Sequence, residues 1–171
     1  MTPLEEHALE LLERLRGRFY GKYRGSVEEV DEDTLRIKAR VPAVLGDATS
    51  GWCLPCVPYA GKQVGFCFLP ERGAMVWIEF EGGDPSYPIW TGCCWRKDEL
   101  PDDAKPEVRV IVTAAKHKLL FDDDQETLTI SDQHENKVTL DSDGVGVERG
   151  GQKVLVSDAS VSLNDSALEV T

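Results

Sequence analysis

Apolar and polar side chains alternate along residues 20–95 with the period of two that is typical of β-strands. Between Leu35 and Val41 every second residue is apolar and the residues between them are cationic, so one face of this strand should be buried and the other solvated. Four further strands are expected at Tyr23–Val30, Val64–Leu69, Met75–Phe80 and Pro88–Cys93. Glycine, proline and acidic turn residues separate them, which predicts a small closed barrel.

The first residues follow a helical period instead. Thr2 can cap a helix, Pro3 suits its first position, and Glu5 stands where a capping box needs a carboxylate. Gly17 is a plausible end. One apolar stripe follows from Leu4, Ala8, Leu11, Leu12 and Leu15. This stripe can pack on the chain's own domain or on a neighbouring subunit, and the sequence leaves both open.

A repeat appears towards the C-terminus. Three segments that begin at Lys118, Lys137 and Lys153 each form a short apolar strand with a turn, and each is followed by a second strand. Such strands are typical of a β-solenoid or β-helix, and we predict a β-helical (β-prism) rod formed by trimerisation. Its core should be made by alternate residues: Leu119, Phe121, Leu128, Ile130, Val138, Leu140, Val145, Val147, Val154, Val156, Val161 and Leu163.

Composition separates the same two regions. The chain has 13 aromatic residues, and Phe121 is the single one beyond residue 97. Residues 98–171 carry a net charge of −10 out of −12 for the chain, which disfavours phosphate backbones and anionic membranes as partners of this part. Acidic side chains on solvated strand positions also simply keep a rod soluble.

We therefore predict a mainly β protein with four parts: an N-terminal helix (1–19), an OB-type β-barrel (20–96), an acidic, proline-containing linker (97–106) and a rod (107–171). A rod of about 60 residues with small side chains buries too little apolar surface to stand alone. Association of three chains around one axis would bury its apolar residues and leave few strand edges open.

The barrel region resembles the OB domain of phage baseplate assembly protein V and of VgrG-like spike proteins of contractile injection systems. The resemblance is carried by Pro58, Tyr59, Gly61, Gly65, Gly73, Gly82, Gly83, Asp84, Pro85 and Gly92. It implies a homotrimeric, non-enzymatic spike on a separate hub or baseplate protein at the end of a tube. It also implies a PAAR-type tip protein on the rod and transient contact with a target membrane when the sheath contracts.

Candidate chemistry is sparse. Cys53 and Cys56 have the spacing of a zinc knuckle, but Cys93 and Cys94, as neighbours on a strand, would point to opposite faces and could not easily complete the site. We expect apolar thiols, no metal and no cofactor. Two other functions stay open: an OB-type module that binds single-stranded nucleic acid or an oligosaccharide, and a zinc or redox protein that uses Cys53 and Cys56.

The sequence also indicates where the chain is made. It shows neither a signal peptide nor an apolar run of membrane-spanning length, and five cysteines, an odd number, suit reduced thiols. We expect synthesis in the cytoplasm and incorporation into a virion or an injection-system particle, with later release from the cell left open.

Overall fold

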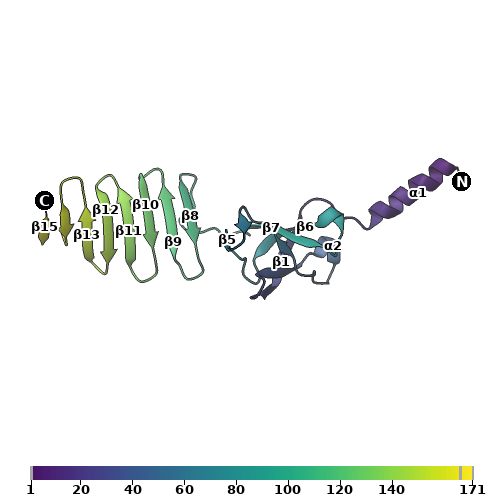
Figure 1. Ribbon diagram of the computed structural model, residues 1–171, viewed down its shortest axis with the longest axis horizontal. Coiled ribbons are helices and arrows are strands. Elements are labelled where there is room, and N and C mark those ends of the chain that lie inside the picture. The colour runs from purple at the N-terminus through teal and green to yellow at the C-terminus, as the bar shows by residue number, and fades with distance from the viewer. Residues whose placement is uncertain (1, 166, 171) are drawn as a thin grey trace. The chain divides into compact units, whose positions relative to one another are not determined.

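The fold is described from a computed structural model of the protein, which describes residues 2–165 and 167–170. The chain divides into two compact units, Met1–Asp98 and Glu99–Thr171, and each is described by itself. Most of the regular structure is β-strand, shown in Figure 1. Among the described residues, no helix is long and apolar enough to cross a membrane.

The first unit begins with α1 (Pro3–Arg16). Thr2 and Glu5 form the predicted capping box, in which each side chain accepts a hydrogen bond from the other residue's backbone N–H. After the helix, the Arg18 guanidinium donates to the Asp84 carboxylate at 2.9 Å, and the Phe19 N–H donates to the Gly83 carbonyl. These contacts fix the chain to the barrel directly after α1.

The barrel is a curled five-stranded sheet in the order β2-β1-β6-β7-β3. Its strands are β1 (Tyr23–Asp31), β2 (Arg36–Arg40), β3 (Leu54–Pro55), β6 (Met75–Phe80) and β7 (Pro88–Cys94). All neighbours are antiparallel except β3 and β7, which are parallel. The two edges also meet, because the Cys53 N–H, just before β3, donates to the Ile37 carbonyl of β2 at 2.8 Å. The sheet therefore closes on itself like an OB-fold.

Three short elements complete this unit: α2 (Pro42–Leu45), the hairpin of β4 (Ala60–Gly61) and β5 (Val64–Gly65), and a 3₁₀ turn η1 (Glu81–Gly83). The predicted strand Val64–Leu69 is wrong beyond Gly65. The fifth barrel strand is the two-residue β3 instead, which is too short to leave an alternating pattern in the sequence. The apolar residues after Gly65 belong to a projecting loop.

The barrel core lies inside the closed sheet. It consists of Val27, Ile37, Ala39, Val41, Cys53, Val76, Ile78, Phe80 and Trp90. On β2 and β6 these residues alternate with partly exposed ones, as the period of two requires. Phe19 and Tyr23 cover one end, with their ring centroids 6.4 and 5.9 Å from that of Phe80. The first unit therefore encloses a core made by one chain.

The second unit is one eight-stranded antiparallel sheet whose strands follow each other in chain order, as Figure 1 shows. They are β8 (Val108–Val112), β9 (Lys118–Asp122), β10 (Thr127–Ser131), β11 (Asn136–Asp141), β12 (Gly144–Arg149), β13 (Gln152–Val156), β14 (Val161–Leu163) and β15 (Leu168–Val170). Within one chain the repeats thus form a meander of hairpins and not the coils of a solenoid. One sheet from each of three chains suits the β-prism form of the predicted rod.

Candidate subunit interface

One face of the eight-stranded sheet carries two continuous apolar rows. In an antiparallel pair, residues directly opposite each other share a face, so the strand register defines each row. The first row is Ile111, Leu119, Ile130, Val138, Val147, Val154, Leu163 and Leu168. The second row is Phe121, Leu128, Leu140, Val145, Val156, Val161 and Val170. All twelve residues predicted as rod core lie in these rows.

The rows contain three residues that the sequence analysis missed, Ile111, Leu168 and Val170. Ile111 was hidden because β8 also has valines on its other face, at 108, 110 and 112, so that no alternation is visible. Leu168 and Val170 alternate around Glu169 in a three-residue strand, which is a short but readable signal. The first row therefore runs from β8 to β15, and the second from β9 to β15.

The apolar face is uncovered in a single chain. Ile130 is 51% exposed, Val147 50% and Val170 62%, although side chains of this kind are usually buried. Among the residues of the second unit whose burial is described, Gly146 alone is buried. An open apolar surface of this length marks a binding site for another protein surface.

The opposite face is different in kind. Its middle row includes Thr129, Thr139, Gly146 and Ser162, beside two leucines and a valine. Charged side chains flank that row: Lys118 pairs with Asp103, and Lys153 lies 3.7 Å from Glu148. This face is more polar than the face with the two rows. The sheet therefore has one face suited to solvent and one apolar face that needs a partner.

The residues of the barrel motif mostly shape turns. Gly82 and Gly83 have φ values of 57° and 76°, which glycine adopts without strain. A Cβ atom at Gly83 would lie 3.0 Å from the Tyr20 ring. The Asp84 carboxylate accepts a hydrogen bond from the Ser86 N–H, and this bond together with nearby Arg18 holds the pKa of Asp84 below its ordinary value. The Gly82–Pro85 stretch thus fixes the turn before β7.

The cysteines are scattered. Cys53 is buried in the barrel core, where burial raises the pKa of its thiol, while Cys56 is exposed. Cys93 is exposed at its surface, but partial desolvation by its surroundings raises the pKa of its thiol as well. Among the described residues, no three potential metal ligands of the His, Cys, Asp and Glu types lie together. In the described part of the chain, Cys53 and Cys56 therefore have no third ligand of these types beside them.

Two tryptophans on the barrel already have cationic partners. The Lys38 ammonium lies 4.6 Å from the centre of the Trp52 ring, and the Arg24 guanidinium 5.7 Å from that of Trp77. A base or sugar that stacked on the same face of either ring would have to displace the cation.

Comparison with protein families gives the same division of the chain. Residues 23–95 match the type VI secretion system/phage-baseplate injector OB domain, and residues 108–169 match the phage baseplate V C-terminal trimerisation domain. The chain belongs to the baseplate V and VgrG-like family of spike proteins. The apolar rows lie within the part that matches the trimerisation domain, apart from Val170, which follows it directly.

A curated relative of this spike family is the actin cross-linking toxin VgrG1 of Vibrio cholerae serotype O1. It is 36% identical over 61 residues, which are 36% of this chain and 6% of the toxin. The chain thus matches only a small part of that relative, and the cross-linking activity in the toxin's name is not transferred to it. Both families matched here are structural parts of baseplates and spikes.

Proposed function

We propose that the protein is the central spike of a phage-tail-like contractile injection system and that it works as a homotrimer. The observation that carries this proposal is the pair of apolar rows on the open face of the second unit. A chain that belongs to a family of spike proteins, and whose trimerisation domain leaves such a face uncovered, is completed by two further copies of itself.

Association of three sheets would turn each open face inward. The two rows would then form a shared core, and the face with Lys118, Lys137 and Lys153 would point to solvent. Full burial of one Val, Leu or Ile side chain contributes about 1.5–3 kcal/mol relative to exposure. Because the first row passes through all eight strands and the second through seven, the sum over three chains would make a stiff rod.

A stiff rod suits a mechanical task, and the proposed role has no enzymatic step. The barrels would sit on a separate hub or baseplate protein at the end of the tube, and the rods would carry a PAAR-type tip protein. When the sheath contracts, the rod would pierce the target envelope and touch its membrane only transiently. The family supports this assignment, and the acidic second unit, which anionic lipids repel, agrees with a brief contact.

Molar mass in solution tests the proposal. Light scattering should give three times the 19.0 kDa of one chain. Val138→Glu places a carboxylate in the first row of each chain, and burial of unpaired charges costs several kcal/mol per site, so this variant should be monomeric. Lys137→Glu changes the neighbouring residue on the opposite face and should stay trimeric. A monomeric wild type, or equal behaviour of the two variants, would overturn the proposal.

A further inference from the structure

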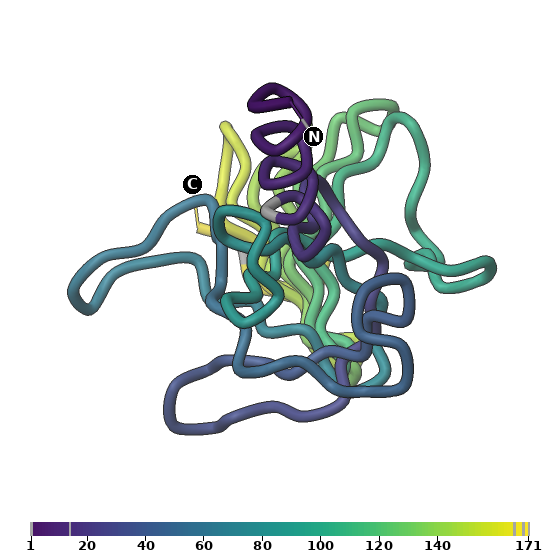
Figure 2. The backbone as a smooth tube through the Cα atoms, turned by 90° about the vertical axis from the view of Figure 1, so that its right-hand side faces the viewer, coloured from purple at the N-terminus to yellow at the C-terminus, as the bar shows by residue number. Residues whose placement is uncertain are grey.

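A second apolar surface lies on the barrel, in residues 56–69, which we call the aromatic hairpin. Its base is the pairing of β4 with β5, and the Phe66 N–H donates to the Tyr59 carbonyl at 2.9 Å. A side chain at Gly65 would bring a Cβ atom 2.9 Å from that same carbonyl oxygen, so the two strands approach each other closely. Figure 2 shows this segment as a loop that stands out from the barrel.

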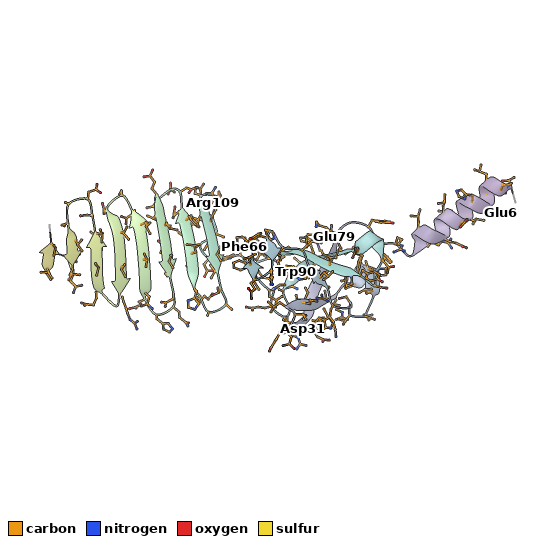
Figure 3. All side chains as sticks on the ribbon, viewed as in Figure 1. Glu6, Asp31, Phe66, Glu79, Trp90 and Arg109 are labelled. Carbon is orange, nitrogen blue, oxygen red and sulfur yellow. The ribbon has the colours of Figure 1, made fainter. Side chains whose placement is uncertain are left out.

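The hairpin presents apolar side chains to water. Tyr59, Val64, Phe66 and Phe68 are each more than half exposed. The rings of Phe66 and Phe68 stack on each other, with centroids 6.1 Å apart, and Figure 3 shows Phe66 outside the strands around Trp90. None of these four residues belongs to the barrel core. A cluster of exposed aromatic and apolar side chains indicates a contact surface.

The hairpin emerges at a particular end of the barrel. Leu54 and Pro55 of β3 run parallel to Ile89 and Trp90 of β7, so the chain leaves β3 in the direction in which β7 continues to Cys94. Beyond Cys94 come Trp95, which is itself 64% exposed, and the connection to the second unit. The aromatic hairpin therefore lies at the end of the barrel that is joined to the trimerisation domain.

We propose that the aromatic hairpin packs on the barrel of a neighbouring copy of this chain, so that the trimer contact continues from the rod onto the barrels. The inference rests on the proposed homotrimer. Because three trimerisation domains hold three such barrel ends together, each hairpin meets a neighbour at an effective concentration on the order of millimolar. Exposed Trp95 at the same end supplies apolar surface that can receive it.

Cys67, between the two stacked phenylalanines, reports on this contact because it is exposed in the single chain. The wild-type protein and the Val138→Glu variant are treated with a maleimide, and peptide mass spectrometry follows Cys67 separately from the other cysteines. We expect labelling of Cys67 to be at least tenfold slower in the trimer than in the monomeric variant. The double variant Phe66→Asp, Phe68→Asp should stay trimeric through its rod and label as fast as the monomer.

A matched control is Tyr87→Asp, which changes an exposed aromatic residue directly before β7, at the other end of that strand. It should leave the slow labelling unchanged. A trimer that labels as fast as the monomer overturns this inference and leaves the proposed function standing. A wild-type protein that is monomeric overturns the proposed function itself.

Two other results would also overturn the inference. Slow labelling of Cys67 in the monomer would mean that the chain shields its own hairpin. Protection of Cys67 that appears only with phospholipid vesicles would assign the hairpin to a membrane.

Discussion

The two units contain similar apolar residues, but the first unit buries them within one chain and the second leaves them exposed. Ile37 and Ile78 of the barrel are fully buried within one chain, whereas Ile130 in the sheet is half exposed. The difference lies in the shape of the sheet. The five-stranded sheet curls until the Cys53–Ile37 hydrogen bond closes it around its own core, while the eight-stranded meander is open and can bury a face only against something else.

This comparison shows how one chain can combine an independent domain with an obligatory interface. The barrel has the aromatic residues needed to fill a closed space, and the sheet has rows of Val, Leu and Ile that can stack in register. The stability of the barrel should therefore belong to the chain, and that of the sheet to the assembly and thus to its concentration.

Two matched truncations separate these sources of stability and should have the largest effects. Ile78→Ala deletes buried atoms from the barrel and should cost about 2–5 kcal/mol of its unfolding free energy, both in the trimer and in the Val138→Glu monomer. Ile130→Ala should be costly only in the trimer, because its side chain is exposed in a single chain. Chemical denaturation of all four combinations, followed by tryptophan fluorescence for the barrel and circular dichroism for the sheet, measures both costs.

Protein concentration provides the control for this pair. The unfolding midpoint of the sheet should fall on dilution, whereas that of the barrel, measured in the Val138→Glu background, should not move. If Ile130→Ala destabilised the monomer as much as the trimer, the sheet would have a core of its own, and the contrast between the two units would be wrong.

The sequence predicted the apolar rows well and the strand arrangement less well. Alternation in repeats led by Lys118, Lys137 and Lys153 identifies one face of each strand, since a period of two does not depend on which strand is the neighbour. It cannot distinguish a meander from a coil, because both are built from short strands and tight turns. In the barrel, Val64–Leu69 looked like a strand because an exposed contact loop and a buried strand can have the same composition.

The turn before β12 allows an intermediate test inside the sheet. Gly144 has a φ of 137°, and a Cβ atom there would lie 2.1 Å from the Val156 carbonyl oxygen of the next strand. Gly144→Ala should therefore force β12 and β13 apart and cost on the order of 1–3 kcal/mol or more. Gly151, with a φ of 82°, has open space at the same position, so Gly151→Ala should cost only the backbone strain of a positive φ, about 1–2 kcal/mol.

Thermal unfolding of the two alanine variants at equal protein concentration measures this difference. Val145 and Val147 follow this turn, and each belongs to one of the two apolar rows. A shift of the turn would displace both rows, so the Gly144→Ala trimer should dissociate at a higher protein concentration than the wild-type trimer. Equal melting temperatures would show that the backbone of the sheet can shift to relieve the clash at residue 144. The alignment of the two rows would then depend less on the strand register than we infer.

The smallest expected effect concerns acid and the turn between β10 and β11. The Asp132 carboxylate accepts hydrogen bonds from the Asn136 side chain and from the backbone N–H groups of His134 and Asn136, and these bonds lower its pKa against a weaker opposing effect of burial. A carboxyl group with a lowered pKa stabilises the folded state above its unfolded-state pKa of about 4, and this contribution is lost as pH falls through the folded-state value. Asp132→Asn should therefore lower the melting temperature slightly at pH 7 and progressively less below pH of about 4, until the variant and the wild type converge. A gap between wild type and Asp132→Asn that stayed constant down to strongly acidic pH would contradict this role of the Asp132 charge.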